Sequence, residues 1–588
     1  MLHVRQFAHP PPSLRLALVQ MNPTVGDLEG NANKILEAVA KAKENAADLV
    51  VFPELALTGY PPEDLLLKPQ FIADNLKTLQ SLVSQIQGIT AVIGFVDGHD
   101  DIFNAAAVVH DGKVVGIHHK VYLPTYGVFD EDRYFQRGGR VQVFRLKGVK
   151  FGVTVCEDIW YPEGPHHVQA LLGDAELIVS INASPFHADK WKVRHRTLSV
   201  RASDDAAVIA YCNVVGGQDE LVFDGHSLVI SPDGDTLARG KAFEEEIVYA
   251  DIDTGEALHR RLIDPRRRKE KLVLAEQLCE IEVVDLPTPA ETTAKPPLPS
   301  RQVAPPAHVE EIYDALTLGL RDYVCKNHFK GVTLGLSGGI DSALTAAIAV
   351  DALGADFVTA VSMPSSITSF ESKDDAEKLA KNLGIKLMTI PIKEVFDAYK
   401  STLKPAFADR PEDIAEENLQ ARTRGNILMA LSNKFGWLVL TTGNKSELSC
   451  GYSTLYGDMA GGFAVIKDVP KTVVYQLSEY RNADEEVIPR RVIEKEPTAE
   501  LREGQKDIDS LPPYPVLDRI LCHYVEEDRS VQEIIRLGFD EATVKRVARM
   551  VDRNEYKRRQ SPPGVKITPK AFGRDRRLPI TNWYGVEG

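Results

Sequence analysis

The sequence has no long hydrophobic run. Nowhere in its 588 residues do about 18 apolar side chains follow one another, which is the length that a membrane-spanning helix requires. The first twelve residues also lack the apolar core of a secretory signal peptide, and three consecutive prolines among them favour an irregular arm. We therefore expect a protein with no membrane partner.

Cysteine is scarce, and the few cysteines lie far apart. No two of them form a CxxC pair, which argues against a zinc site, and their scatter gives no disulfide framework. The six are Cys156, Cys212, Cys279, Cys325, Cys450 and Cys522. A reducing cytoplasm is therefore the expected compartment.

Positive charge is in deficit. Lysine and arginine number 69 against 84 aspartates and glutamates, which gives a formal net charge of -15. Nonspecific binding to nucleic acid normally needs a basic face, so we expect no nucleic-acid partner. The net charge does not exclude small anionic substrates, because they need only a local positive pocket.

The length requires more than one folded unit. A chain of 588 residues is too long for a single hydrophobic core. Residues 285–306 read DLPTPAETTAKPPLPSRQVAPP, with seven prolines and neither a helical nor a strand period, which is typical of an extended linker. We expect an N-terminal domain over residues 1–284, the linker over 285–306, and a C-terminal domain over 307–588.

Both domains have an α/β pattern. In the N-terminal region short apolar strands alternate with helical stretches, and turn residues at 111–112 and 232–234 predict hairpins, so a layered domain with two sheets is expected. In the C-terminal region the strands at 332–336, 357–363, 386–390 and 437–441 alternate with helices. That order predicts a parallel sheet with its functional loops at the carboxyl ends of the strands.

Three potentially catalytic residues of the N-terminal region each follow a predicted strand. Glu54 follows residues 49–52, Lys120 follows 114–117, and Cys156 follows 151–155. A thiol with an ordinary pKa of about 8.5 needs a base, for which Glu54 is the candidate. Lys120 and the backbone N–H of the next residue after Cys156 are candidates to stabilise an oxyanion. A lone cysteine after a strand is more often a small buried hydrophobe, so the combination carries the inference.

The sequences on either side of these three residues strengthen the inference that they are catalytic. The strings FPEL around Glu54, HHKVYLP around Lys120 and TVCEDIW around Cys156 resemble the nitrilase superfamily over about residues 14–253. This superfamily uses a Glu-Lys-Cys triad on an αββα sandwich. The CEDIW form is similar to the glutaminase branch that is fused to NAD synthetases. The resemblance implies that the bound glutamine is contacted by Tyr126, Ser184 and Lys190.

The most specific signal in the chain is LGLSGGIDS, residues 334–342, between a predicted strand and a predicted helix. Its glycines let the backbone approach a polyphosphate, its serines add hydroxyl donors, and the helix start offers free N–H groups. Asp341 would repel phosphate unless Mg²⁺ intervened. No GKS or GKT follows, so this is not a Walker A loop. A plain strand-to-helix turn would explain SGG alone.

The full SGGIDS string resembles the PP-loop pyrophosphatases, which cleave ATP to AMP and pyrophosphate on a doubly wound parallel sheet of the adenine nucleotide alpha hydrolase type. Residues 416–433, 440–472 and 554–568 are similar to the NAD synthetase family within that group. The resemblance implies that ATP is bound by Gly335, Leu336, Ser337, Gly338, Gly339, Ile340, Asp341, Ser342 and Thr442.

The same resemblance implies the other ligand sets. Mg²⁺ would be held by Asp341 and Glu447, in line with its preference for oxygen ligands. Deamido-NAD would be contacted by Asn418, Glu447, Asp458 and Lys557. Lys471, in the string VPKT, is a further phosphate candidate.

Together the two resemblances imply one reaction. The N-terminal domain would release ammonia from glutamine, and the C-terminal domain would use ATP to activate the carboxylate of deamido-NAD, so that ammonia displaces AMP and gives NAD as a product. The family commonly forms homo-oligomers. Two alternatives stay open at this point. One is another PP-loop amidotransferase such as a GMP synthetase, although no Cys-His-Glu glutaminase motif surrounds Cys156. The other is a non-catalytic nucleotide sensor, which the retained catalytic residues disfavour.

Overall fold

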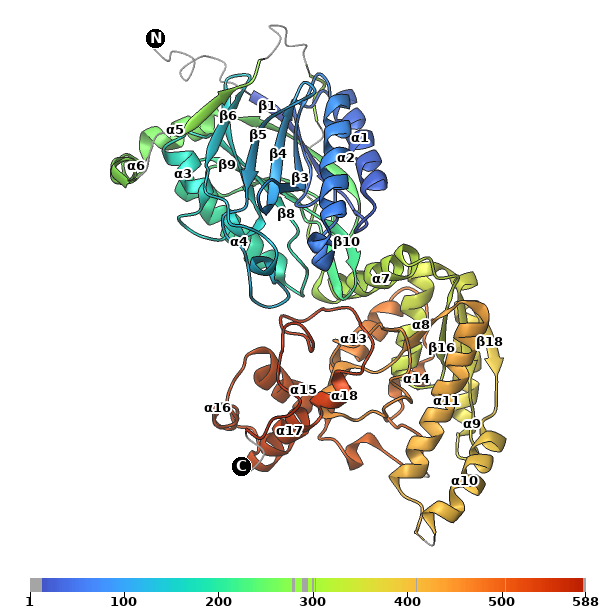
Figure 1. The fold of residues 1–588 in the computed structure, drawn as a ribbon. Helices are drawn as coiled ribbons and strands as arrows, with labels where there is room; N and C mark the ends of the chain where they lie inside the picture. The colour runs from blue at the N-terminus through green and yellow to red at the C-terminus, as the bar shows by residue number, and fades with distance from the viewer. Residues whose placement is uncertain are drawn as a thin grey trace, which may run out of the picture. The chain divides into compact units, whose positions relative to one another are not determined.

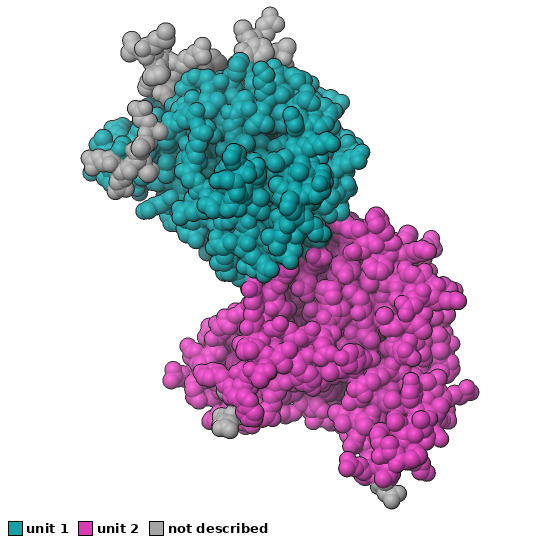
Figure 2. Space-filling model, in the orientation of Figure 1, with its two compact units in different colours: residues 1–218, 223–306 teal, residues 219–222, 307–588 magenta. Residues whose placement is uncertain are grey.

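The computed structural model describes residues 13–277, 281–287, 295–298, 301, 303–408, 410–502 and 504–584. The chain divides into two compact units, which Figure 2 shows in different colours. Unit 1 comprises Met1–Gln218 and Phe223–Pro306, and unit 2 comprises Asp219–Val222 and Ala307–Gly588. The N-terminal arm, Cys279 and part of the proline-rich segment lie outside the described residues.

Unit 1 contains two sheets. The six-stranded sheet has the order β14-β1-β2-β3-β4-β5 and the seven-stranded sheet the order β13-β12-β9-β8-β7-β6-β15. The strands of the first are β1 (Ser13–Gln20), β2 (Leu49–Val51), β3 (Thr90–Gly98), β4 (Ile102–His110), β5 (Lys113–His119) and β14 (Glu246–Asp253). Those of the second are β6 (Gln142–Leu146), β7 (Val149–Val155), β8 (Leu177–Asn182), β9 (Val208–Asn213), β12 (Leu228–Ile230), β13 (Thr236–Arg239) and β15 (Glu282–Asp285). Asp285, expected at the start of the linker, is thus the last residue of a sheet strand.

The two sheets pack face to face and are covered by helices on their outer faces. Along β1, Leu14, Leu16 and Leu18 join the cluster between the sheets, whereas Ala17 and Val19 face the helices, as the period of two requires. The helices are α1 (Leu28–Glu44) and α2 (Pro69–Gln85) on one side and α3 (Pro165–Leu171) and α4 (Lys190–Asp205) on the other (Figure 1). The predicted αββα sandwich is confirmed.

The remaining elements of unit 1 are peripheral. Both predicted hairpins are present, because β4 pairs with β5 and β12 pairs with β13, each antiparallel. Helices α5 (Gly255–Ile263) and α6 (Arg266–Gln277) follow β14. The strands β10 (Val215–Gln218) and β11 (Leu221–Asp224) form a two-stranded sheet, and the turn between them and the first two residues of β11, Asp219–Val222, group with unit 2.

Unit 2 is built on a five-stranded parallel sheet of order β18-β17-β16-β19-β20. The strands are β16 (Val332–Gly335), β17 (Val358–Ser362), β18 (Lys386–Thr389), β19 (Leu438–Thr441) and β20 (Phe463–Ala464). The chain runs outward from β16 in one direction and then returns to add β19 beside it. This reversal is the switch point at which doubly wound sheets bind ligands, and it confirms the predicted fold class.

Helices surround this sheet and extend beyond it. The helices that precede β19 in the chain are α7 (His308–Lys326), α8 (Ile340–Leu353), α9 (Phe370–Leu383), α10 (Lys393–Phe407) and α11 (Ile414–Phe435). The others are α12 (Lys445–Cys450), α13 (Lys471–Arg481), α14 (Arg490–Glu494), α15 (Tyr514–Leu521), α16 (Val531–Arg536), α17 (Glu541–Arg553) and α18 (Glu555–Arg558). Among the described residues, no helix combines the length and hydrophobicity needed to cross a membrane.

Candidate active sites

The structure brings the three candidate residues of unit 1 together. Cys156 lies directly after β7 and opens a short 3-10 helix (Cys156–Ile159) with a positive φ of 46°, an uncommon conformation for a residue with a side chain. Lys120 follows β5, and its Nζ donates to Glu54 Oε1 at 2.7 Å. The side chains of Lys120 and Glu54 are completely buried. The strand ends therefore converge on one site, as the sequence predicted.

Glu54 is fixed by donors from three different elements. Besides Lys120, Asn104 Nδ2 on β4 donates to Oε1 at 2.7 Å, and the backbone N–H of Ala183, after β8, donates to Oε2 at 2.8 Å. Hydrogen bonds to a buried carboxylate hold both its position and its charge. Glu54 is therefore oriented before any substrate arrives.

A second buried carboxylate, Glu131, belongs to this site and was missed from the sequence. Its Oε1 accepts from Lys120 Nζ at 2.8 Å and from the hydroxyl of Tyr60 at 2.9 Å. Burial, and next to it the Glu54 carboxylate, raise the pKa of Glu131 to about 7, although Lys120 acts against them. Glu131 opens a short 3-10 helix, Glu131–Arg133, with no motif around it, so no signal in the sequence marked it.

The thiol of Cys156 is electrostatically coupled to the same groups. Burial raises the pKa of this thiol, the Glu54 carboxylate raises it further, and the Lys120 ammonium opposes both. A neutral thiol is a poor nucleophile, so it requires a base at the moment of attack. Glu54, whose carboxylate lies close enough to affect this thiol, is the group placed for that task.

The three residues expected to contact glutamine lie around this centre. The hydroxyl of Tyr126 donates to both carboxylate oxygens of Glu157, the residue after Cys156, at 2.9 and 3.0 Å. Burial raises the pKa of Glu157, and the ammonium of Lys190, which opens α4, is among the groups that oppose this rise. Ser184 is buried and follows Ala183, whose N–H contacts Glu54.

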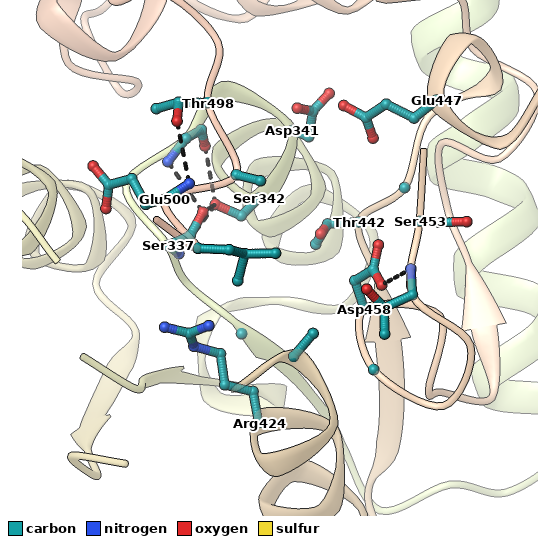
Figure 3. Close-up of a pocket in the computed structure, with 18 of the residues that line it drawn as sticks. Ser337, Asp341, Ser342, Arg424, Thr442, Glu447, Ser453, Asp458, Thr498 and Glu500 are labelled. Carbon is teal, nitrogen blue, oxygen red and sulfur yellow. Dashed lines mark hydrogen bonds between the residues drawn. The ribbon is translucent and has the colours of Figure 1, made fainter. Parts of the chain in front are cut away.

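Unit 2 has a pocket of about 410 Å³ at the carboxyl ends of β16 and β19 (Figure 3). It is lined by most of the glycine-rich loop, Gly335–Ser342, and by the predicted ligand residues Asn418, Thr442, Glu447, Asp458, Lys471 and Lys557. Gly338 does not line it. With a φ of +80°, and with a Cβ there lying 2.3 Å from the backbone oxygen of Ser372, this position requires glycine for conformation and close packing.

The loop itself is internally ordered. Ser342 Oγ donates to the oxygen of Gly339 at 2.9 Å and lies 3.1 Å from Ser337 Oγ. Helix α8 begins at Ile340, and its N-cap, Gly339, carries no side chain to cap the first N–H groups. Free N–H groups at a helix start bind anions, so this loop can receive a phosphate.

Two carboxylates face each other across the pocket (Figure 3). Asp341 is on α8 and Glu447 on α12, and Lys471 Nζ donates to both, to Glu447 Oε1 at 3.4 Å. Burial raises the pKa of Glu447 to about 8, and Asp341, Asp507 and Asp458 add to the rise although Lys471 opposes it. The Lys471 ammonium thus lies among three carboxylates, those of Asp341, Glu447 and Asp507. An all-oxygen donor set with this excess of negative charge fits Mg²⁺.

The residues expected to contact deamido-NAD surround the loop 451–458. Asn418 Oδ1 accepts from the hydroxyl of Thr454 at 2.8 Å, and Asp458 Oδ1 accepts from the backbone N–H of Thr454 at 2.6 Å. Lys557 Nζ donates to the backbone oxygens of Gly451 and Ser453 at 2.7 and 2.8 Å. Burial raises the pKa of Asp458 to about 6 and lowers that of Lys557.

Comparison with known proteins agrees with both sites. Residues 15–259 match the carbon-nitrogen hydrolase family, and residues 312–561 match NAD synthase. The glutamine-dependent NAD(+) synthetase of Thermotoga maritima is 52% identical over 580 residues, covering 97% of this chain and 99% of its own. The chain belongs to the glutamine-dependent NAD(+) synthetases.

Two further members of this synthetase family support the assignment. The enzyme of Aquifex aeolicus is 49% identical over 97% of this chain and 100% of its own. A solved structure of the synthetase from Acinetobacter baumannii in complex with ADP is 43% identical, with a TM-score of 0.73 over 97% of this chain and 99% of its own. The predicted activity, a ligase that takes its nitrogen from the glutamine amide, is confirmed, and a GMP synthetase and a nucleotide sensor are set aside.

Proposed function

We propose that unit 1 releases ammonia from glutamine at Cys156, and that unit 2 consumes ATP with Mg²⁺ to amidate deamido-NAD in the glycine-rich pocket. The observation that carries this proposal is the convergence of each predicted residue set on one site within its own unit. The sets are dispersed along the chain, and a fold without these activities has no reason to gather them.

In unit 1, Glu54 takes the proton from Cys156, and the sulfur attacks the amide carbon of the glutamine side chain. Lys120 and the backbone N–H of Glu157 stabilise the oxyanion of the tetrahedral intermediate. Glu54 returns the proton to the leaving nitrogen, ammonia departs, and a thioester is left. Water, activated by Glu54, then hydrolyses the thioester to glutamate and the free thiol. Tyr126, Ser184 and Lys190 hold the glutamine.

In unit 2, the residues of Gly335–Ser342 other than Gly338, together with Thr442, bind ATP, with the phosphates at the start of α8. Asp341 and Glu447 would hold Mg²⁺, which when bound supplies positive charge beside the phosphates. Lys471 adds a fixed positive charge in the same place. The deamido-NAD carboxylate, held through Asn418, Glu447, Asp458 and Lys557, attacks the α-phosphorus, and pyrophosphate leaves. Ammonia then attacks the acyl carbon, and AMP leaves.

We further propose that the protein works in a reducing cytoplasm as a homo-oligomer. In the described part of the chain Cys156, Cys212, Cys325, Cys450 and Cys522 are all free thiols, which suits a reducing compartment. The oligomer rests on the family resemblance, and sedimentation analysis of the purified protein tests it.

The reaction is tested by incubating the protein with ATP, Mg²⁺, glutamine and deamido-NAD. We expect AMP, pyrophosphate, glutamate and NAD, with one AMP for each NAD. Formation of ADP and phosphate in place of AMP and pyrophosphate would contradict the adenylation step. Full activity in excess chelator would contradict the metal role of Asp341 and Glu447.

A further inference from the structure

The two side chains that face Asp341 in the synthetase pocket come from different helices. Glu447 is on α12, which has only six residues, and Lys471 is the first residue of α13. A short helix and a helix start have little rigidity of their own, because few of their backbone groups are bonded within the helix. Something else must fix them relative to each other.

Asp518, on α15, is one residue that contacts both helices. Asp518 Oδ1 accepts the hydroxyl of Ser446, the residue before Glu447. Asp518 Oδ2 accepts the backbone N–H of Thr472 at 2.9 Å and its hydroxyl at 2.8 Å. Ser446 Oγ in turn accepts the backbone N–H of Lys471 at 2.9 Å. One carboxylate therefore binds the starts of both helices.

We propose that Asp518 is a positioning residue that sets Glu447 and Lys471 against Asp341 for synthesis. This inference rests on the proposed roles of Glu447 and Lys471. The chemistry requires a carboxylate, because an ionised carboxylate accepts through both oxygens and offers no donor. Its three donors come from α12 and α13, so these hydrogen bonds fix the positions of Glu447 and Lys471 in the pocket wall.

Helix α15 is anchored by apolar packing. Leu517, Ile520 and Leu521 pack into a buried cluster with residues of α16 and α17. The same helix carries Tyr514, whose ring lies 5.3 Å from Lys471 Nζ and whose hydroxyl donates to Asp507 at 2.7 Å. Asp518 is not among the described residues that line the pocket, so it acts through Ser446 and Thr472 and not on the substrate.

The chain offers a matched control in Asp351. This residue is on α8, in the same unit, and its carboxylate accepts from Arg481 at 2.6 and 3.0 Å and from the hydroxyl of Tyr313 at 2.5 Å. Arg481 is the last residue of α13, so Asp351 anchors the opposite end of the helix that Asp518 anchors at its start. Asp351 does not line the pocket among the described residues.

The test compares Asp518→Asn with Asp351→Asn in the full-length protein. Three quantities are measured: the midpoint of thermal unfolding, the kcat and KM for ATP in NAD synthesis driven by ammonium, and the dissociation constant of ATP with Mn²⁺. The binding measurement omits deamido-NAD, so no turnover occurs. The use of ammonium keeps the glutaminase site out of the assay.

We expect Asp518→Asn to lower kcat by about 10- to 100-fold and to weaken binding of ATP with Mn²⁺, as losses of supporting hydrogen bonds around metal sites generally do. Asp351→Asn should leave both near the wild-type values, with a similar or larger fall in the unfolding midpoint. Adding Ser446→Ala to Asp518→Asn should lower kcat little further, because both substitutions break the same hydrogen-bonded connection. Equal effects of Asp518→Asn and Asp351→Asn, or unchanged kcat and binding in Asp518→Asn, would overturn the proposal.

Two additional variants keep the outcome interpretable. Glu447→Gln tests the proposed function separately: if it is fully active, the role of Glu447 fails, whereas if it is impaired and Asp518→Asn is not, only the positioning role fails. If Asp518→Asn does not fold, Thr472→Val removes one of the three bonds and carries the same test. A kcat loss in Thr472→Val supports the proposal, and an unchanged kcat rejects it.

Discussion

The two active sites differ in how their charges are matched. In unit 1, Lys120 lies between Glu54 and Glu131, all three are buried, and further donors hold the carboxylates in place. In unit 2, Lys471 lies between Asp341 and Glu447 in an open pocket, and Asp458 and Asp507 add to the negative charge. The first site is complete within the protein, whereas the second has an excess of carboxylates that a bound Mg²⁺ would offset.

This difference teaches what each site requires. A glutaminase must activate one thiol against one neutral substrate, so the whole arrangement can be prepared in advance. A synthetase must bring together a triphosphate, a carboxylate and a metal ion, so its own carboxylates repel one another until the metal ion binds. Substitutions of the buried charged groups should therefore lower activity and stability together in unit 1, whereas substitutions of the pocket carboxylates in unit 2 should lower activity without lowering stability.

The largest expected effect separates the two sites by nitrogen source. Cys156→Ala should reduce glutamine-driven NAD synthesis by a factor on the order of 10³ or more, because the nucleophile is lost. The same variant should still make NAD from an ammonium salt, since no step in unit 2 uses this thiol. Cys212→Ala, a buried cysteine on β9, is the matched control and should keep both activities. A folded Cys156→Ala protein that uses glutamine normally, or that cannot use ammonium, would contradict the division of labour.

The next effect tests the matched charges of unit 1. Lys120→Met would leave Glu54 and Glu131 as neighbouring buried carboxylates without their shared cation. Removing one partner of a buried ion pair costs about 3–5 kcal/mol of unfolding free energy, and glutamine hydrolysis should be lost as well. Denaturant unfolding and a glutaminase assay check the two results. Wild-type stability in this variant would show that Lys120 is not the group that holds the site together.

A smaller effect is expected at the deamido-NAD end of the pocket in unit 2. Lys557→Ala should raise the KM for deamido-NAD about tenfold, the size expected when a hydrogen bond to a charged group is lost, while glutamine hydrolysis persists. Arg559→Ala is a suitable control, because Arg559 pairs with Glu555 and does not line the pocket among the described residues. Equal KM values for deamido-NAD in both variants would show that Lys557 does not contact this substrate.

The smallest effect concerns pH. Because the pKa of Glu131 is raised to about 7 in the folded protein, the folded state holds a proton that the unfolded chain releases near pH 4.5. The stability from this group is therefore present at acid pH and is lost as the pH rises through about 7. Glu131→Gln should flatten the fall in unfolding midpoint between about pH 5 and 8.5. Parallel pH profiles for the two proteins would show that Glu131 does not carry the proton.

The sequence predicted those residues of the sites that lie within short sequence motifs. Cys156, Lys120 and Glu54 stand at strand ends within short motifs, and Asp341 stands in the glycine-rich string, in the first turn of α8. Both fold classes followed in the same way, from the alternation of strands and helices.

The supporting residues could not be predicted, because only the folded chain brings them close. Glu131 reaches Lys120 from a short 3-10 helix, Asn104 on β4 reaches Glu54, and Asp518 reaches Ser446 and Thr472 from a helix far along the chain. Gly338 shows the converse: its place in the motif was clear, but its reason is the close approach of Ser372 and not the pocket.

The comparison between the sites is tested most directly by two isosteric substitutions measured together. Thermal unfolding of Glu54→Gln and Glu447→Gln is followed at pH 8.5 without substrates or divalent ions, above the pKa of about 8 of Glu447. Glu54→Gln should lower the unfolding midpoint, because an amide N–H₂ would face the donors that now bind the carboxylate, at a cost of about 1–3 kcal/mol. Glu447→Gln should keep or raise the midpoint, because a repelled charge is removed, although synthesis is lost. A fall of similar size in both variants would contradict the account.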